Sequence, residues 1–502
     1  MSEKYDVVII GSGLGGLLCG AILSKNGYSV CILEKHSQLG GNLQTFKRKG
    51  CKFNTGMHYV GSLDNGQILN KIFKYIGILD RLELVRLDED CFEKIFIEEK
   101  EYCYSMGINN FREKLFAYFP EEKDNILNYI NKLQQAWDAT NILALKNLPN
   151  QHEHIMKIDM LTESVSKVIN SITENTELRT LLVATNGLYA GIPDKTPFHI
   201  HALINLFFIQ SAFKFKNGSD NLVYALKSVI EENNGVIFTN KEVLQINFNN
   251  NRVLSLETKD KSIVFGNSFI SNIHPAQTNQ LIKDEGKLRK VYIQRISNLE
   301  NSIGSFVLYI ILKKKKIKHI NSNIYYSKSK DVWTANNYKQ SDWPTGYMLY
   351  TCPDENNLEF AKSITVISSM KFEDVKKWKD SITGKRDEDY NVFKKDRSNK
   401  LIKLVSKKFN NIEDSIETFY SSTPLTYRDY TGVPEGSMYG IIKDCNDPIS
   451  TFISTYTKIP NLYLTGQNVG LHGILGVTIS AIISCSAFID INKLIKDIRE
   501  IK

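Results

Sequence analysis

Residues 5–34 read YDVVIIGSGLGGLLCGAILSKNGYSVCILE, and this stretch decides the fold. An apolar strand is expected over Tyr5–Ile10, a glycine turn over Gly11–Gly16 and a helix over Leu17–Asn26. A second strand, Ser29–Leu33, ends at Glu34. The order strand, glycine turn, helix and strand predicts a parallel α/β unit that holds the ADP half of a dinucleotide.

Each glycine of the motif GSGLGG has a physical role in such a unit. Gly11 permits the tight turn, Gly13 lets the backbone approach the pyrophosphate, and Gly16 lets the helix pack closely on the sheet. The helix N-terminus faces the phosphates with free N–H groups. Glu34 is expected to accept hydrogen bonds from the ribose hydroxyls. The alternative is a glycine-rich turn without a ligand, which would not need the strand, helix and acidic residue in register.

A glycine pair, Gly40-Gly41, follows Glu34 and allows a second close approach of the backbone to a dinucleotide. Nicotinamide-dependent dehydrogenases do not usually carry this pair. It is typical of the large flavoprotein superfamily that includes amine oxidases and carotenoid desaturases. Those enzymes often carry arginine where this chain has Asn42. The pair therefore favours FAD over NAD as the cofactor.

The C-terminal part repeats the order strand, glycine turn and helix. A strand is expected over Asn461–Thr465, a tight turn over Gly466-Gln467-Asn468, and a helix that Gly473–Val477 opens. In the flavoprotein superfamily a segment like this binds the ribityl chain, and backbone N–H groups at the helix start stabilise negative charge on reduced flavin. Gln467 replaces the usual acidic residue and can still hydrogen-bond the ribityl hydroxyls. A buried helix with a glycine cap is the alternative for this segment taken alone.

The middle of the chain separates these two patterned ends. Helical periodicity dominates from about Asn65 to Ile209, and strands are expected over Ser302–Leu312, Ser363–Met370 and Ser415–Tyr420. A cofactor domain built from both termini, with a second domain inserted, explains this order.

The predicted fold class is therefore α/β, with a Rossmann-like FAD-binding domain built from both termini and an inserted α+β substrate domain. A helix over Asn221–Asn234 and a hairpin over Gly235–Ser271 are expected within the first of these. The predicted FAD-binding domain comprises residues 1–75, 215–300 and 440–502. The substrate-binding domain comprises residues 76–214 and 301–439, with a helical membrane-facing part.

Composition excludes several other classes of protein. The net charge of +8 is mild for 502 residues, and no basic, aromatic-interleaved motif indicates nucleic-acid binding. The eight cysteines show neither a CxxC pair nor metal-ligand spacing, so no metal is predicted and we expect reduced cysteines. No apolar run reaches the roughly 18 residues of a membrane span, and a strand near the N-terminus leaves no room for a signal peptide. We expect a cytoplasmic protein.

Five further motifs carry a resemblance to a known family. They are FNTGMHYVG at residues 53–61, FKNGS at 215–219, SNIHP at 271–275, STPLT at 422–426 and LTGQN at 464–468. With these motifs in this order, the chain resembles a bacterial member of the phytoene desaturase, carotenoid isomerase and retinol saturase family. The resemblance covers almost the whole chain, and the HYVG and TPLT stretches favour the retinol saturase and isomerase side.

The resemblance implies one FAD per chain, a long apolar polyene-like substrate, such as a carotenoid or retinoid, and a tunnel from a membrane surface to the flavin. The family includes saturation, desaturation and isomerisation of C=C bonds, and we favour a saturase-type reaction. Because a polyene comes from lipid, peripheral contact with the inner face of the cytoplasmic membrane is expected. The lysine run Lys313–Lys316 could meet anionic lipid, and Ile200–Phe213 could meet the membrane or form the tunnel wall.

Saturating a C=C bond requires a hydride from reduced flavin and a proton for the other carbon. The catalytic residues predicted to supply that proton are His58, Tyr59 and His472, with Tyr189 and Tyr427 as further candidates. The alternative for either histidine is to orient the flavin or hydrogen-bond a backbone carbonyl. The predicted cofactor-binding residues are Gly11, Gly13, Leu14, Gly15, Gly16, Glu34, Lys35, Gly40, Gly41, Asn42, His58, Val243, Gly466, Gln467, Gly473, Leu475, Gly476 and Val477.

Two other functions remain open at this point. One is an amine-oxidase-like flavoenzyme that acts on a small polar substrate. The other is a non-catalytic flavin- or lipid-binding protein similar to the Rab escort proteins. The sequence carries no second GxGxxG motif for NAD(P)H, so the electron donor or acceptor is open as well.

Overall fold

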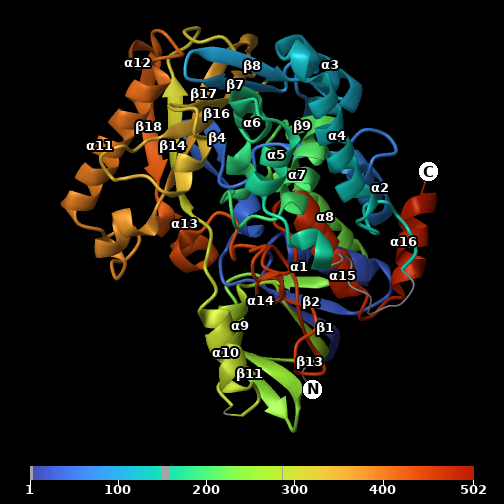
Figure 1. Ribbon diagram of the computed structural model, residues 1–502. Coiled ribbons are helices and arrows are strands. Elements are labelled where there is room, and N and C mark those ends of the chain that lie inside the picture. The colour runs from blue at the N-terminus through green and yellow to red at the C-terminus, as the bar shows by residue number, and fades with distance from the viewer. Residues whose placement is uncertain (1–3, 149–157, 285, 502) are drawn as a thin grey trace.

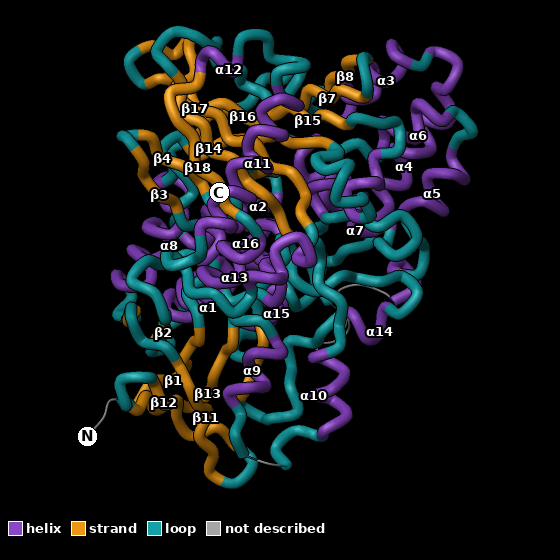
Figure 2. Tube along the Cα trace, turned by 90° about the vertical axis from the view of Figure 1, so that its left-hand side faces the viewer, coloured by secondary structure: helices purple, strands orange, loops and turns teal. Residues whose placement is uncertain are grey.

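The structure is a computed structural model that describes residues 4–148, 158–284 and 286–501. Two large β-sheets organise the described chain, and they lie toward opposite ends of the molecule in Figures 1 and 2. Helices, among them α1 (Leu14–Lys25) and α15 (Gly473–Cys485), lie between them.

The first sheet has the strand order β10-β2-β1-β13-β12-β11, with β19 paired to β13. Strands β10, β2, β1, β13 and β19 are parallel neighbours, whereas β11 and β12 form an antiparallel hairpin on the edge. Its strands are β1 (Lys4–Ile10), β2 (Val30–Leu33), β10 (Val236–Phe238), β11 (Val243–Asn249), β12 (Arg252–Thr258), β13 (Ile263–Ser271) and β19 (Leu462–Leu464).

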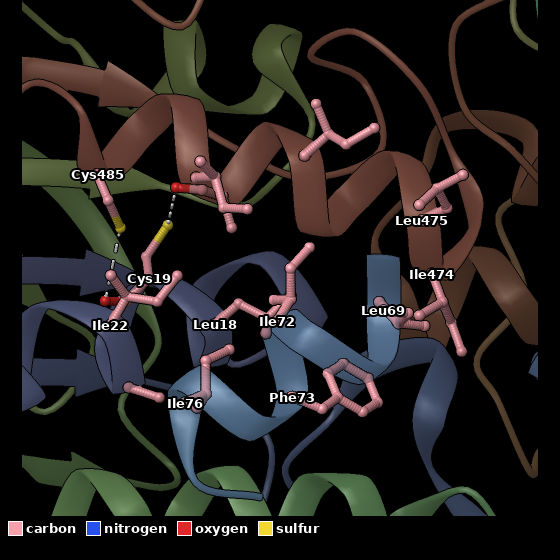
Figure 3. Packing of buried hydrophobic residues seen from close by; sticks show 14 of the residues in the cluster. Leu18, Cys19, Ile22, Leu69, Ile72, Phe73, Ile76, Ile474, Leu475 and Cys485 are labelled. Carbon is pink, nitrogen blue, oxygen red and sulfur yellow. Dashed lines mark hydrogen bonds between the residues drawn. The ribbon is translucent and has the colours of Figure 1, made fainter. Parts of the chain in front are cut away.

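Helix α1 packs against other elements on every side. Each residue from Gly15 to Ser24 is buried, which explains why its sequence is apolar without an amphipathic stripe. Figure 3 shows side chains of α1, α2 (Ile68–Ile76) and α15 meeting in one cluster. In that cluster the Cys19 Sγ lies 3.7 Å from the carbonyl oxygen of Ala481. Both ends of the chain thus share one hydrophobic core.

The predicted fold class is confirmed, since a Rossmann-like parallel sheet is built from both ends of the chain. The expected hairpin over Gly235–Ser271 is wrong in part. The consecutive strands β11, β12 and β13 are antiparallel neighbours, whereas β10 lies in parallel beside β2 and β13 also pairs in parallel with β1. Strand β13 ends in the buried run Phe269-Ile270-Ser271, as expected of a central parallel strand. The domain boundaries given above stay a prediction.

The second sheet has the order β18-β14-β17-β16-β15-β7-β8, and its neighbours are antiparallel except for the pair β15 and β7. Its interior strand β14, second in this order, is buried at every residue. One face of β14 packs toward α11 (Glu388–Val405), and the other packs against Phe53. The strands are β7 (Glu93–Ile97), β8 (Lys100–Tyr104), β14 (Gly304–Leu312), β15 (Asn323–Ser327), β16 (Gly346–Asp354), β17 (Asn357–Met370) and β18 (Ile416–Ser422).

The stretch from Asn65 to Ile209 is less uniformly helical than its periodicity predicts. Its main helices are α2, α3 (Ile108–Tyr118), α4 (Lys123–Asp138), α5 (Val165–Ile172), α6 (Thr176–Leu182) and α7 (Phe198–Gln210). The short strands β6 (Leu84–Arg86), β7 and β8 interrupt them, because β7 completes the second sheet beside β15. Helix α7 is mostly buried, so Ile200–Phe213 is a core segment rather than a membrane-facing surface.

A disulfide joins Cys91 to Cys103 beside the β7–β8 hairpin. The expectation of reduced cysteines is wrong for this pair, which the hairpin brings together from twelve residues apart. The remaining cysteines of the described chain form no disulfide. Within the same described ranges, no helix combines the length and the apolar character needed to cross a membrane.

The other elements connect these layers. They are β3 (Thr45–Arg48), β4 (Cys51–Asn54), β5 (Val60–Gly61), β9 (Ala212–Phe215), α8 (Asp220–Glu232), α9 (Pro275–Leu281), α10 (Lys290–Ser297), α12 (Ile412–Ser415), α13 (Pro424–Thr431), α14 (Pro448–Thr451) and α16 (Ile491–Glu500).

Candidate cofactor and substrate site

The glycine turn between β1 and α1 has the geometry that its sequence predicts. Gly11 has a φ of +91°, which favours glycine, and a Cβ placed on Gly16 would lie 2.2 Å from the carbonyl oxygen of Gly11. Helix α1 begins at Leu14 with Gly13 as its N-cap, without a side-chain cap and without an acidic residue in its first turn. The N-terminus of α1 therefore has backbone N–H groups available to donate hydrogen bonds to an anionic group.

Glu34 is bound to the same turn. Its Oε2 accepts hydrogen bonds from the backbone N and the Oγ of Ser12 at 2.9 and 2.6 Å, and its Oε1 accepts one from the backbone N of His36 at 2.9 Å. A carboxylate can accept about four hydrogen bonds, so capacity for another remains on Oε1. Glu34 also lines a cavity, so it can both hold the turn and bind a hydroxyl group.

The glycine pair and the C-terminal turn close around this motif. Gly40 has a φ of +106° and donates its N–H to the carbonyl oxygen of Ser12 at 3.1 Å. From the other end of the chain, Gly466 has a φ of +94°, and a Cβ placed on Gly15 would lie 2.9 Å from its Cα. The three glycine segments thus approach one another closely at the ends of β1, β2 and β19.

These segments enclose a cavity of about 500 Å³, which we call the first cavity. Its volume is within the range of small-molecule sites. Most of the predicted cofactor residues line it: Gly11, Gly13, Leu14, Gly15, Glu34, Lys35, Gly40, Gly41, Asn42, Val243, Gly466, Gln467, Gly473 and Val477. Together with the uncapped helix end and the free capacity of Glu34, this lining fits a dinucleotide.

Three other described members of the predicted set, Gly16, Leu475 and Gly476, lie behind the cavity wall. Gly16 and Gly476 are needed for packing, because a Cβ on Gly476 would lie 2.4 Å from the Cβ of Leu471. Leu475 belongs to the core cluster shown in Figure 3. These residues shape the wall without facing the cavity.

A second cavity of about 180 Å³ adjoins the first. The two share Asn42, Gly56, Met438 and Tyr439 as lining residues. The second cavity lies against the second sheet and has a mostly apolar and tyrosine-rich lining that includes Tyr59, Ile95, Val307, Tyr325 and Ile367. An apolar ligand in the second cavity would therefore lie next to a ligand in the first.

The predicted proton donors are distributed around these cavities. His58 lines the second cavity rather than the first, and its Nδ1 lies 3.1 Å from the hydroxyl of Tyr350. Burial and the nearby charge of Lys214 lower the pKa of His58 to about 3, so the imidazole is neutral near pH 7.

His472 is the N-cap residue of α15 and lines neither of the two cavities of the described chain. The centroid of its ring lies 4.3 Å from that of the Tyr439 ring. Burial, with the charge of Lys443, lowers the pKa of His472 to about 4. Neither His58 nor His472 therefore carries an extra proton at neutral pH.

The tyrosine candidates differ in their positions. Tyr59 and Tyr427 line the second cavity, and the Tyr427 hydroxyl donates to the carbonyl oxygen of Thr55 at 2.8 Å. Tyr189 lies outside both cavities, with its hydroxyl 2.9 Å from the Nδ1 of His201. Close to Tyr427 in the chain, Asp429 accepts hydrogen bonds from Arg428 and Arg386.

Sequence reasoning missed several lining residues. Asn272 and His274 line the first cavity directly after β13, and the motif SNIHP at the end of a predicted strand was a usable signal for them. Met438 and Tyr439 reach both cavities from a loop without a motif. Tyr325 lies on β15, and only the paired strands bring it to the site.

Comparison with known proteins supports this arrangement. A sequence model of NAD(P)-binding Rossmann-like domains matches residues 9–76. The chain is 26% identical to an all-trans-retinol 13,14-reductase of Danio rerio, over 98% of this chain and 87% of the relative. It is 21% identical to a chloroplastic prolycopene isomerase of Daucus carota, over 93% and 77%. Its fold is similar to that of a crystallised oxidoreductase from Methanosarcina mazei, with a TM-score of 0.64, 16% identity and coverage of 95% and 98%.

These similarities confirm two predictions from the motifs. The resemblance to the phytoene desaturase, carotenoid isomerase and retinol saturase group extends over nearly the whole chain. The expectation of an oxidoreductase is confirmed by the same relatives.

Proposed function

We propose that this chain is an FAD-dependent oxidoreductase that acts on a C=C bond of a long apolar polyene lipid, such as a carotenoid or retinoid, and that it saturates this bond. The observation that carries the proposal is the common wall of the two cavities. A dinucleotide-type cavity and an apolar, tyrosine-rich cavity share Asn42, Gly56, Met438 and Tyr439. A cofactor and an apolar substrate would meet at this wall.

The first cavity supplies the groups that FAD requires. The N-terminus of α1 and the backbone around Gly13 and Gly41 suit the pyrophosphate, and Glu34 suits the ribose hydroxyls. Gln467, in the C-terminal turn, can hydrogen-bond the ribityl chain. When bound, FAD supplies the hydride chemistry of the reaction.

The second cavity supplies the environment for the alkene. Its apolar side chains, including Ile95, Val307 and Ile367, exclude water and can bind a hydrocarbon through apolar contacts alone. Its tyrosines supply the polar contacts, and their hydroxyls are the groups able to hold or move a proton at a substrate carbon.

The direction of the reaction is decided by product mass. The purified protein, loaded with FAD, is incubated with retinol and with a longer carotenoid, each with the chemically reduced and with the oxidised protein. Saturation adds two hydrogen atoms, desaturation removes two, and isomerisation leaves the mass unchanged and shifts the chromatographic retention. We expect the reduced protein to add two hydrogens.

Several results would contradict the proposal. Failure of the purified protein to take up FAD refutes the cofactor. Hydrogen peroxide release with amines, and no product with polyenes, would instead indicate an amine-oxidase-like enzyme. Bound FAD that no donor or acceptor reduces or reoxidises would indicate a non-catalytic binding protein. Comparing the lipids of cells with and without the gene then identifies the double bond that changes.

We also propose peripheral binding to an anionic membrane surface, because a polyene substrate resides in lipid. Lys313–Lys316 form an exposed run directly after β14, and each such lysine contributes about 1 kcal/mol near an anionic surface. Co-sedimentation with vesicles of anionic lipid, lost when these lysines are replaced by glutamine, tests this proposal. Equal sedimentation of both proteins would contradict it.

A further inference from the structure

Glu93 places a carboxyl group in the interior without a cation beside it. It is the first residue of β7 and only 1% exposed. Its Oε1 accepts a hydrogen bond from the Tyr59 hydroxyl at 2.5 Å, and its Oε2 is buried without a hydrogen-bond partner in the described chain. An ionised carboxylate in such a place is costly, because neither a charge nor a full set of donors compensates for its lost hydration.

The carboxyl group is separated from the second cavity by tyrosine hydroxyls. Tyr59 and Tyr325 both line that cavity, and their hydroxyl oxygens lie 3.1 Å apart. Ile95 follows Glu93 on the same face of β7 and lines the cavity too. A ring of Phe208 stacks on Tyr59, with the centroids 4.1 Å apart, and fixes the ring whose hydroxyl contacts Glu93. Glu93 therefore reaches the cavity through Tyr59.

The groups that face Glu93 within the described chain carry no positive charge that would favour its ionised form. They are the phenols of Tyr59, Tyr325 and Tyr104 and the amide of Asn323, which lies beside Glu93 in the pairing of β15 with β7. No ion pair within the described residues includes Glu93. Burial raises the pKa of Glu93 to about 8, although the hydrogen bond from Tyr59 opposes the rise. The carboxyl group thus holds a proton near pH 7.

We propose that Glu93 stores the proton of the reaction and that Tyr59 delivers it to a carbon of the substrate in the second cavity. This inference rests on the proposed function. Tyr59 is the catalytic residue, Glu93 restores its proton, and Tyr325 is a positioning residue that holds the Tyr59 hydroxyl.

The step balances in atoms and electrons. A reduced flavin dinucleotide held in the first cavity would supply the hydride, and with it both electrons, to one carbon of the C=C bond and would become oxidised. The O–H bond of Tyr59 breaks, and its proton forms the new C–H bond at the other carbon. The proton of Glu93, carried on Oε1 with the hydrogen bond to Tyr59 reversed, then passes to the Tyr59 oxygen and restores its hydroxyl. Glu93 remains as a carboxylate until it takes a proton from water.

The test compares wild-type protein with Glu93→Gln, Tyr59→Phe and the matched control Tyr104→Phe, all loaded with FAD. Tyr104 lies beside Glu93 but donates its hydroxyl to the carbonyl oxygen of Leu181 and lines neither cavity. The first measurement is the infrared C=O band of protonated carboxyl groups as a function of pH. We expect a band that disappears near pH 8, is absent from Glu93→Gln and is present in Tyr104→Phe.

The second measurement is a single turnover of chemically reduced protein with a polyene, as a function of pH and in deuterated water. We expect Glu93→Gln and Tyr59→Phe to slow the step about 100-fold. Glu93→Gln should also lose the decline in rate that the wild type shows as the pH rises through 8. Tyr104→Phe should keep both the rate and the profile. The deuteron should appear at one carbon of the product.

The two measurements separate this inference from the proposed function. Titration of the Glu93 band below pH 5, or an unchanged rate and pH profile in Glu93→Gln, would overturn the inference. Wild-type protein that turns over no polyene refutes the proposed function instead, and the infrared titration then decides the protonation of Glu93 without reference to turnover.

Discussion

Replacing Gly16 by alanine should disrupt the close packing of α1 on the glycine turn. An ideal Cβ on Gly16 would lie 2.2 Å from the carbonyl oxygen of Gly11, far inside the roughly 3.5–4 Å of an ordinary contact. The nearest atom belongs to the backbone, so the turn itself must move. Overpacking of this kind costs about 1–3 kcal/mol, and alanine returns about 1 kcal/mol of helix propensity. Because the contact is with backbone, the cost should lie at the upper end of this range, and we expect a net loss of about 2 kcal/mol in unfolding free energy.

Gly20→Ala is the matched control in the same helix. Its Cβ would lie 2.8 Å from the Cδ1 of Ile32 and 3.1 Å from the Cδ1 of Ile230, which are the ends of flexible side chains. The gain in helix propensity is the same, and the crowding can be relieved by rotation of these side chains. We therefore expect Gly20→Ala to be nearly neutral in stability and to bind FAD as the wild type does.

Urea denaturation of the FAD-free proteins measures the change in unfolding free energy, and titration of flavin fluorescence measures the affinity for FAD. Because the displaced turn forms part of the first cavity, Gly16→Ala should weaken FAD binding at least tenfold, which corresponds to about 1.4 kcal/mol. If Gly16→Ala unfolds at the urea concentration of the wild type and binds FAD with the same Kd, the close packing of α1 on the turn has no role in either property.

Three further predictions concern Glu34, His201 and the disulfide. Glu34→Gln removes the charge that accepts two hydrogen bonds from Ser12, and should raise the Kd for FAD about tenfold; an unchanged Kd in flavin titration would argue against a role in cofactor binding. Burial lowers the pKa of His201 to about 3 in the folded protein, below its ordinary value near 6.5 in the unfolded chain. The contribution of His201 to stability is therefore fully present above pH 6.5. Below pH 6.5 the unfolding free energy decreases by about 1.4 kcal/mol for each pH unit. Urea denaturation at pH 7 and pH 5 should show a smaller decrease for His201→Gln than for the wild type, and equal decreases would contradict this. Replacing both Cys91 and Cys103 by serine should lower the unfolding free energy by about 3 kcal/mol in oxidising buffer and have little effect in reducing buffer; peptide mapping without reductant would detect the bond directly, and two free thiols in that map would rule it out.

The first cavity could be predicted from the sequence because its determinants are local. The segment from Tyr5 to Glu34 contains the strand, the turn and the helix end within thirty residues, and Gly40-Gly41 and Gly466-Gln467 carry the same signals in short motifs. The motif SNIHP at residues 271–275 could have been used in the same way. Glycines at tight turns leave a pattern that needs no knowledge of the partner strands.

The second cavity could not be predicted in this way, because its determinants are far apart in the chain. Tyr59 meets Glu93 from 34 residues away and Tyr325 from 266 residues away. Neither the strand β7 nor the parallel pairing of β7 with β15 was expected within a stretch of helical periodicity. A glutamate at the start of a short strand looks like a solvent-exposed residue until the sheet is assembled around it.

The closure of the first cavity by β19 and Gly466 has a consequence for biosynthesis. A ribosome releases the glycine turn at Gly11–Gly16 first, but the opposite wall, which β19 anchors on β13, emerges only after all the intervening residues have been translated. A nascent chain that has not reached Leu462 has no complete first cavity. Loading of the proposed cofactor therefore follows translation of β19, and a chain truncated before β19 also lacks α15 and exposes apolar residues of α1 to chaperones and proteases.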